Sequence, residues 1–344
     1  MKEAAKRACV IGAGAWASAL AVVLSDNGYQ VKLWARNPNT VEHFSSTRRV
    51  PRLPDIILPS TITATTDVNE ALAGASLTVI AIPSSAVSSV AARIGKDLPP
   101  ESFVVTATKG FDFETLKRPS QVWIDANPGL KKRLCVLSGP NFAAEIAQRL
   151  PAATVIAAEE ESTRLAVQHA FMTAYFRVYT HVDMAGVEIG GALKNIIALA
   201  CGMAQGMGIG HNAQAAIISR GIAELTRLGV CLGAEPLTFA GLSGLGDLVL
   251  TSTGHLSRNR QAGIAVGKGE PINAFLTRTG YTVEGLETVK TARELSLIHD
   301  VQMPITDVVY RILYKGLSVS EGLSEMMSRK RKPEREPFFK PGYH

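Results

Sequence analysis

Charged residues are scarce in this chain of 344 residues, where Asp, Glu, Lys and Arg make up 19%, against about a quarter in an ordinary domain. Aromatic residues are also few, at 6%, whereas hydrophobic residues reach 46%. This composition excludes a disordered, collagen-like or coiled-coil chain. At about 150 residues per domain, the length favours two domains.

Cysteine and histidine lack the spacing of metal sites. The four cysteines (Cys9, Cys135, Cys201 and Cys231) form no C-x-x-C pair, and the seven histidines show no H-x-x-x-H spacing. The sequence therefore predicts no metal site. Each cysteine lies in an apolar stretch, which predicts buried, reduced thiols in a cytoplasmic protein.

The basic surplus is concentrated in one segment. The net charge is +6, but residues 328–344 hold six Lys or Arg and two Glu, which leaves about +2 for the rest of the chain. A nucleic-acid-binding protein needs a basic stripe on its folded body, so the sequence predicts no nucleic-acid partner. We interpret 328–344 as a basic, proline-containing tail.

Residues 8–24 carry no charge and follow the basic residues Lys2, Lys6 and Arg7. This pattern is also typical of a signal peptide or a short membrane span. The segment contains turn-forming glycines, and we interpret it as a strand, a glycine turn and a helix. No integral membrane segment is predicted.

The hydrophobic pattern differs between the two halves of the chain. Short β-branched runs predict strands over residues 8–11, 30–34, 77–82, 103–106, 134–137, 154–157 and 177–180, with helices between them, for example over 15–27 and 84–97. This alternation favours an α/β fold with a doubly wound parallel sheet. From Asp183 on, apolar residues recur at helical spacing. We therefore predict an α/β domain over 1–182 and an all-helical domain over 183–327.

The first expected strand runs directly into Gly12-Ala13-Gly14-Ala15-Trp16-Ala17. This matches G-x-G-x-x-G/A: Gly12 permits the tight turn, Gly14 lets a pyrophosphate approach, and Ala17 allows close packing of helix and strand. At the start of a βαβ unit the pattern predicts a Rossmann-type dinucleotide site. A glycine turn without a ligand is the alternative.

Arg36 follows the second expected strand, about 24 residues after Gly12, where an NAD-selective unit carries Asp or Glu. A guanidinium there suits a ribose 2′-phosphate, so we predict that NADP is accepted beside NAD. A solvated charge at the strand end is the alternative.

Lys194 is the single charge in residues 189–204, an expected helix that is apolar on nearly all sides and hence buried. Desolvation favours its neutral amine, so such a lysine can act as an acid near neutrality. As a lone buried charge, its removal should leave the fold no less stable. Gly190 and Gly191 predict a close approach to this helix. A lysine that reaches solvent from the helix surface is the alternative.

Three further segments have the composition of an anionic substrate site. Thr108-Lys109-Gly110 follows a strand, Gly244-Leu245-Gly246-Asp247 places a carboxylate among glycines, and Ser257-Arg258-Asn259-Arg260 offers several donors for a phosphate. Singly, each is equally compatible with a solvated loop.

Together, the segments resemble the NAD(P)-dependent glycerol-3-phosphate dehydrogenase family in its bacterial form, from about Ala8 to Met327. The resemblance rests on the segments above, on Ser138-Gly139-Pro140-Asn141-Phe142-Ala143, on Gly190-Gly191-Ala192-Leu193-Lys194-Asn195, on Gly241-Leu242-Ser243-Gly244-Leu245-Gly246-Asp247-Leu248 and on Val283-Glu284-Gly285. It implies a Rossmann-type domain followed by an all-helical domain like the C-terminal domain of 6-phosphogluconate dehydrogenase.

The family pattern also implies roles for individual residues. Catalysis falls to Lys194, Lys109 and Asp247. Cofactor contacts fall to Gly12, Gly14, Ala15, Trp16, Arg36, Arg52, Lys109, Asn141, Ala143, Arg258, Thr282 and Glu284. Substrate contacts fall to Lys109, Gly139, Asn141, Lys194, Asn195, Asp247, Thr251, Ser257, Arg258 and Asn259. Ala15, Arg52, Asn141 and Thr282 depart from the residues usual in the family.

The implied activity is the interconversion of dihydroxyacetone phosphate and sn-glycerol 3-phosphate with NAD(P)H, which supplies phospholipid synthesis in the cytoplasm. A homodimer is compatible with it. The alternatives are a related β-hydroxyacid or ketopantoate-type dehydrogenase and a catalytically inactive dinucleotide-binding protein.

Overall fold

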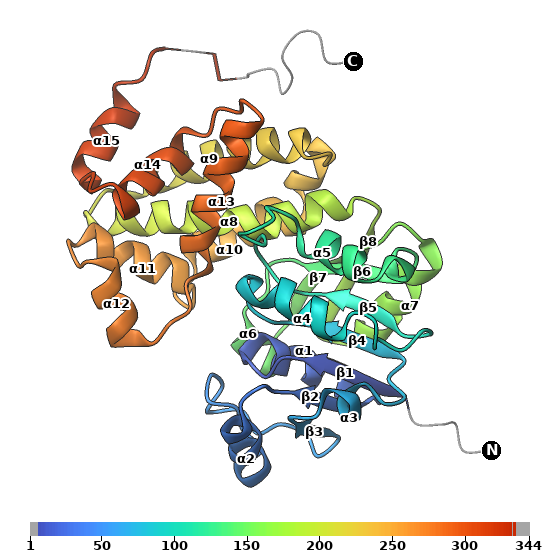
Figure 1. Ribbon diagram of the computed structural model, residues 1–344. Coiled ribbons are helices and arrows are strands. Elements are labelled where there is room, and N and C mark those ends of the chain that lie inside the picture. Colours follow the sequence, from blue (N-terminus) through green and yellow to red (C-terminus); the bar gives the residue numbers. More distant parts are fainter. Residues whose placement is uncertain (1–5, 332, 335–344) are drawn as a thin grey trace. The chain divides into compact units, whose positions relative to one another are not determined.

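The computed structural model describes residues 6–331 and 333–334, so most of the predicted tail, 328–344, lies outside the described residues. The chain forms two compact units, which are described separately (Figure 1). The α/β unit consists of the described residues up to Asp112 together with Lys117–Met184. The helical unit consists of Phe113–Leu116 and the described residues from Ala185 on.

The α/β unit is built on one eight-stranded sheet of order β3-β2-β1-β4-β5-β6-β7-β8. The strands are β1 (Arg7–Ile11), β2 (Gln30–Trp34), β3 (Ile62–Thr65), β4 (Leu77–Ile80), β5 (Phe103–Thr106), β6 (Leu134–Ser138), β7 (Ala152–Ala157) and β8 (Phe176–His181). Strands β1 to β6 are parallel, and β1 lies between β2 and β4. The strand order therefore reverses beside β1, which is where sheets of this kind bind ligands.

All seven predicted strands are present and the predicted fold class is confirmed, but the sheet departs from the prediction in two ways. The edge strand β3 was not predicted. The sheet is also not wholly parallel, because β7 runs antiparallel to β6 and β8 runs parallel to β7. β7 begins at the end of the strands at which β6 finishes, and there the Asn141 side chain donates to the Ala153 carbonyl. The chain therefore returns through the sheet in the direction opposite to β6.

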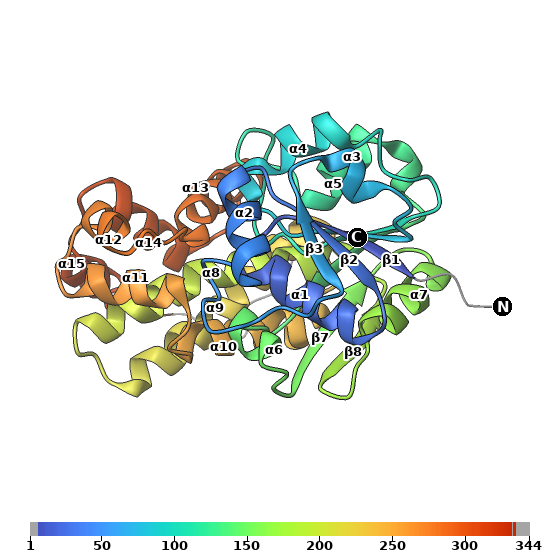
Figure 2. The same ribbon diagram turned by 90° about the horizontal axis from the view of Figure 1, so that it is seen from below.

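Helices cover both faces of this sheet (Figure 2). One face packs against α1 (Ala15–Asp26), α6 (Ala143–Ala147) and α7 (Glu161–Phe171). The other packs against α3 (Val68–Leu72), α4 (Val87–Ile94) and α5 (Pro119–Ala126). The remaining elements are α2 (Pro38–Thr47) and the 3₁₀ turns η1 (Ser84–Ala86) and η2 (Pro128–Leu130). Residues 8–24 thus form strand, turn and helix, as predicted.

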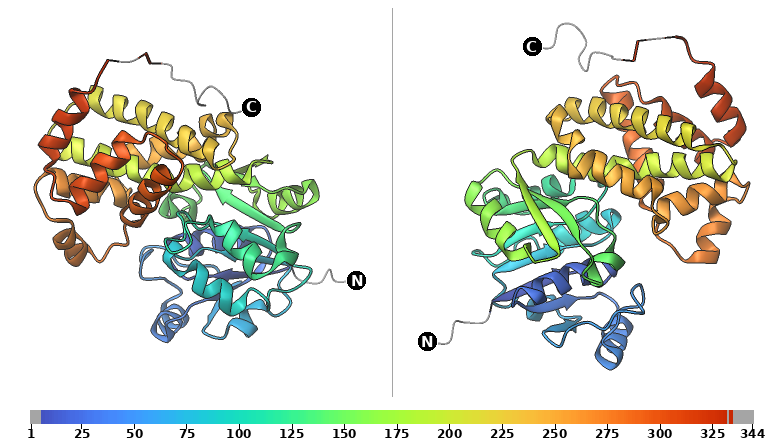
Figure 3. Two further views of the ribbon diagram at one scale, coloured as in Figure 1. Left: turned by 45° about the horizontal axis from the view of Figure 1, so that its top comes forward. Right: turned by 180° about the vertical axis from the view of Figure 1, so that it is seen from behind.

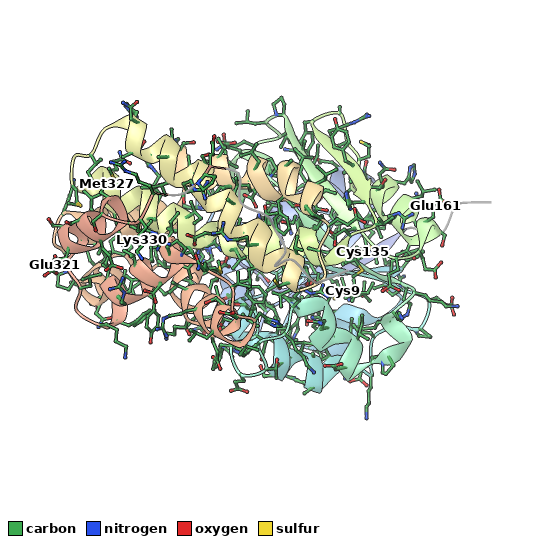
Figure 4. All side chains as sticks on the ribbon, turned by 90° about the horizontal axis from the view of Figure 1, so that it is seen from above. Cys9, Cys135, Glu161, Glu321, Met327 and Lys330 are labelled. Carbon is green, nitrogen blue, oxygen red and sulfur yellow. The ribbon has the colours of Figure 1, made fainter. Side chains whose placement is uncertain are left out.

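Cys9 on β1 and Cys135 on β6, both labelled in Figure 4, are buried, as is Cys201 in the helical unit. Burial raises the pKa of the Cys9 thiol to about 12 and that of Cys201 to about 11, so both are poor nucleophiles. Cys231 contradicts the prediction of buried thiols, since it is exposed at the end of α9.

The helical unit contains no strand within its described residues. Its elements are α8 (Met184–Gly206), α9 (His211–Cys231), η3 (Pro236–Ala240), η4 (Leu242–Gly246), α10 (Asp247–Thr253), α11 (Arg258–Gly267), α12 (Ile272–Thr279), α13 (Glu284–Ile298), α14 (Pro304–Tyr314) and α15 (Val319–Met327). Figure 3 shows α8 running between the other helices of this unit. Among the described residues, α8 alone is long and apolar enough to cross a membrane, but 89% of its most apolar stretch is buried inside the protein.

Glycines bring α8 and α11 together backbone to backbone. A Cβ atom added at Gly202 would lie 2.2 Å from the Arg260 carbonyl oxygen, and one at Gly263 would lie 2.2 Å from that of Leu199. One turn further on, Gly206 and Gly267 make equivalent approaches at 2.4 and 2.3 Å. Two G-x-x-x-G pairs thus face each other and fix the separation of the two helices.

Candidate active site

The glycine turn after β1 has the geometry that a dinucleotide requires. Gly12 has φ +122°, and a Cβ atom there would lie 2.5 Å from the Ala81 carbonyl oxygen, so only glycine fits. Gly14 begins α1 without a side-chain cap, and a Cβ atom there would meet nothing within 4 Å. The N–H groups of the first turn, which starts at Ala15, thus have no side-chain cap, and the space beside Gly14 is open, as the binding of a pyrophosphate requires.

Three loops at the carboxyl ends of β1, β5 and β6 are tied together. The Trp16 indole donates to the carbonyl of Ala107, 3.1 Å away, just after β5. Lys109, in the same loop, donates to the carbonyl of Gly139, 3.1 Å away, just after β6. The structure thus places the predicted residues Trp16, Lys109 and Gly139 beside the glycine turn.

Two predicted cofactor residues lie on the exposed surface of this unit. Arg36 lies two residues after the end of β2 and immediately before Asn37, which caps α2. Arg52 lies in a turn closed by the bridge between Val50 and Leu53. Both residues are exposed.

Asn141 lies two residues after Gly139, and a hydrogen bond from its side-chain amide fixes its position. Its Nδ2 donates to the Ala153 carbonyl at 2.9 Å, while its Oδ1 is buried without a hydrogen-bond partner among the described residues. A buried acceptor of this kind indicates a place for a ligand donor. Ala143, two residues on, is the first residue of α6.

In the helical unit, Lys194 is buried and paired. Its residue exposure is 5%, and its ammonium donates to the carboxylate of Asp247 and, over 2.9 Å, to the hydroxyl of Thr251. Thr251 in turn donates to Asp247 at 3.2 Å. These three side chains, the lysine cluster, exclude the alternative of a lysine that reaches solvent.

The lysine cluster corrects one prediction, because Lys194 is not a lone charge. Asp247, 1% exposed, begins α10 directly after the π-helical turn η4. At Gly190, where a close approach was predicted, a Cβ atom would lie 2.7 Å from the Ser243 carbonyl oxygen. Removal of Lys194 alone would therefore leave a buried carboxylate without its cation, which destabilises a fold.

Asn195 and Asn259 connect three helices beside this cluster. The Asn259 amide donates to the Asn195 side-chain oxygen at 2.9 Å, and its own oxygen accepts from the Gly285 N–H at 2.9 Å. The Nδ2 of Asn195 is buried without a partner among the described residues. Gly285 stands in the segment Val283-Glu284-Gly285 that carries the resemblance but was given no role of its own, because its contribution is a backbone N–H.

The remaining predicted residues lie at the starts of α11 and α13. Ser257 is buried and caps α11, since its hydroxyl accepts from the Arg260 N–H. Arg258, the first residue of α11, is exposed. Glu284 begins α13, and Thr282 is exposed just before it.

Comparisons with known proteins agree with this arrangement. Residues 7–164 match the model of the NAD-dependent glycerol-3-phosphate dehydrogenase N-terminus, and residues 183–324 match that of the C-terminus. The chain is 48% identical to glycerol-3-phosphate dehydrogenase [NAD(P)+] of Moorella thermoacetica over 328 residues, which cover 95% of this chain and 97% of the relative.

Solved structures are similar as well. The crystal structure of glycerol-3-phosphate dehydrogenase from Coxiella burnetii is 34% identical, with a TM-score of 0.90 over 94% of this chain and 99% of that one. A ketopantoate reductase from Ralstonia eutropha, 14% identical with a TM-score of 0.54 over 92% of this chain and 99% of that one, shares the fold alone. The chain belongs to the NAD-dependent glycerol-3-phosphate dehydrogenase family.

Proposed function

We propose that this chain interconverts dihydroxyacetone phosphate and sn-glycerol 3-phosphate with NAD(P)H, and so supplies glycerol 3-phosphate for phospholipid synthesis. The observation that carries the proposal is the lysine cluster beside Asn195. A buried ammonium held by a carboxylate and a hydroxyl, next to an amide with an unpartnered donor, suits the protonation of a substrate oxygen.

The residues of the glycine turn fit a nicotinamide dinucleotide. Gly12 and Gly14 leave room for the pyrophosphate. The other proposed contacts in this unit are Ala15 and Trp16 at the start of α1, Asn141 in the loop after β6, and Ala143 at the start of α6. Arg36 would bind a 2′-phosphate, with Arg52 as a second cation. When bound, the reduced nicotinamide supplies the hydride. Arg258, Thr282 and Glu284 are further proposed cofactor contacts.

Lys194 is proposed to deliver the proton to the oxygen of the substrate carbonyl. Asp247 and Thr251 hold the ammonium at one place, so that little reorganisation is needed as negative charge develops on that oxygen. Lys109 is proposed to stabilise the same charge and to contact the substrate together with Gly139 and Asn141.

The phosphate of the substrate is assigned to the start of α11. Arg258 offers a charge-assisted contact, and Ser257, Asn259 and Asn195 offer hydroxyl and amide groups. Binding there is remote from the reacting carbon, so its energy can be used to orient the carbonyl.

Three further statements belong to the proposal. The enzyme acts in the cytoplasm, in keeping with the buried thiols of Cys9, Cys135 and Cys201. The substrate domain ends near Met327, so that residues 328–344 are not needed for turnover. A homodimer is compatible with the proposed activity.

The decisive assay mixes the full chain with NADPH and dihydroxyacetone phosphate and follows the loss of NADPH absorbance. Ketopantoate and a β-keto acid serve as competing substrates, and NADH replaces NADPH in a parallel series. Turnover with dihydroxyacetone phosphate alone supports the proposal. Turnover only with the acids would assign the related dehydrogenases, and cofactor binding without turnover would assign an inactive binding protein.

A further inference from the structure

Within the segment 257–260, Arg260 is the residue to which the proposed active site assigns no role. It lies on α11 directly after Asn259 and lines a cavity of about 440 Å³ in the helical unit. Gln205 at the end of α8, His211 and Gln214 at the start of α9, and Thr253 at the end of α10 line the same cavity. A cavity of this size accommodates a small metabolite.

This cavity is separate from the lysine cluster. Gln205 lies eleven residues beyond Lys194 on α8, which at about 1.5 Å per residue places it roughly 16 Å further along the helix. No residue of the lysine cluster lines the cavity, although Thr253 follows Thr251 by two residues on α10.

The lining of the cavity carries the positive charge of Arg260 and no negative charge. No carboxylate lines it. Arg260 forms no ion pair with any residue in the described part of the chain, and its guanidinium makes one long hydrogen bond, of 3.5 Å, to the Gly254 carbonyl. In the same unit, by contrast, the guanidinium groups of Arg278, Arg293 and Arg311 each pair with a carboxylate. The positive charge at Arg260 is thus left unbalanced beside an open cavity.

We propose that this cavity is a second anion site, which binds a small metabolite through its phosphate or carboxylate group. The planar guanidinium of Arg260 binds two oxygens of such a group, and the side-chain amides of Gln205 and Gln214 add neutral donors, whereas the Thr253 hydroxyl already donates to the Val249 carbonyl. Gly210 begins α9 without a side-chain cap, so the first N–H groups of that helix add to the attraction.

The site would act close to the proposed substrate site, because Arg260 is two residues from Arg258 on α11. An anion bound at Arg260 can therefore change the position of the start of α11 without contact with the substrate.

The test is isothermal titration of the full chain with inorganic phosphate and, separately, with citrate. Arg258→Gln serves as the background, because it removes the proposed phosphate contact at the active site and leaves the cavity intact. In that background, with the cofactor site saturated by NADPH so that its own phosphate positions are filled, we expect one further anion per chain. Addition of Arg260→Gln should weaken its binding about tenfold or more, as expected for loss of a charge-assisted contact.

Gln214 provides a matched pair that does not depend on how Arg260 variants fold. Gln214→Glu places a carboxylate in the cavity and should abolish binding, whereas Gln214→Lys should strengthen it, and both should leave turnover unchanged. Binding of phosphate alone or of citrate alone assigns the ligand class. No binding in the Arg258→Gln background, or binding unchanged by Arg260→Gln and both Gln214 variants, would overturn the proposal.

Discussion

Lys109 and Lys194 show how differently the two units hold a functional cation. Lys109 stands in a loop after β5, half-buried, with a carbonyl oxygen as acceptor. Lys194 lies inside a buried helix, with the buried carboxylate of Asp247 as its partner. In the α/β unit, turn geometry shapes the site and leaves its side chains near solvent. In the helical unit, the site is part of the core. Function and stability should therefore be separable in the first unit and coupled in the second.

The largest effect is expected from Lys194→Ala. Loss of a positioned acid should lower kcat by about 10²–10⁴-fold. Because Asp247 would stay buried without its cation, the free energy of unfolding should fall as well, by about 3–5 kcal/mol. Steady-state kinetics and urea unfolding of the same preparation measure both effects.

Two variants separate these effects. Lys194→Met combined with Asp247→Leu removes both charges and should regain much of the stability without regaining turnover. Lys109→Ala should lower activity with a much smaller loss of stability. Near-normal kcat in Lys194→Ala would place the acid elsewhere, with Lys109 the first residue to examine.

Glu224 is a second buried charged group of the helical unit, and it should make the free energy of unfolding depend on pH. This α9 carboxyl is 1% exposed and accepts from the N–H groups of Ile305 and Thr306 at the start of α14. Burial raises its pKa from 4.5 to about 7. Because the pKa of Glu224 is raised in the folded state, the contribution of this carboxyl to stability is fully present below pH 4.5 and is lost as the pH rises through about 7. The loss amounts to about 3 kcal/mol.

Glu224→Gln should therefore flatten the fall in unfolding free energy between pH 5 and pH 8, measured by urea unfolding. Glu321 is the matched control, since it also accepts from a backbone N–H at a helix start, that of Ser318, but is exposed. Hydrogen bonds from Ser318 lower the pKa of Glu321, so its contribution has the opposite sign and is lost as the pH falls. An equal slope in wild type and Glu224→Gln would show that Glu224 does not titrate in this range.

These contrasts also explain what the sequence could predict. Strands such as β1 and β4 are short, mostly apolar runs that are buried almost throughout, and the spacing of the glycines predicts the turn at Gly12, so the local sequence pattern was enough. Strand β3 was missed because a short edge strand, Ile62-Thr63-Ala64-Thr65, buries only its first residue. The reversed direction of β7 depends on a connection that no periodicity records.

Partners distant in sequence were the other failure. Asp247 lies 53 residues from Lys194, so a helix with a single charge could not reveal the ion pair. Glu224 meets Ile305 and Thr306 across 81 and 82 residues, and nothing near it in the sequence indicates burial of its carboxyl. Local chemistry was therefore predictable in both units, whereas the coupling of charge to stability in the helical unit was not.

A smaller effect, on binding alone, is expected from Gly14→Ala. A Cβ atom at Gly14 meets no protein atom within 4 Å, so the melting temperature should stay within a degree or two of the parent. The methyl group would instead occupy the space of the pyrophosphate and should raise KM for NADPH and NADH alike, by about tenfold or more. Gly210→Ala is the control, because Gly210 also begins a helix in open space and should leave both KM values unchanged. A large drop in melting temperature for Gly14→Ala would break the proposed separation of function and stability in the α/β unit.

The smallest effect is expected from Arg36→Ala, which should weaken binding of the 2′-phosphate of NADPH and change neither the fold nor the binding of NADH. Arg36 is exposed and makes no hydrogen bond or ion pair with the described residues, so Arg36→Ala should leave the melting temperature unchanged. A charge-assisted contact to the 2′-phosphate is worth roughly 1.5–3 kcal/mol, so KM for NADPH should rise about tenfold or more while KM for NADH stays nearly constant. Arg52→Ala, in the same unit and equally exposed, tests whether a second cation shares the 2′-phosphate, in which case the double variant should lose more than either single one. Equal losses for NADPH and NADH would refute the assignment, since NADH carries no phosphate at that position, and Arg36 would then be a solvated charge at the end of β2.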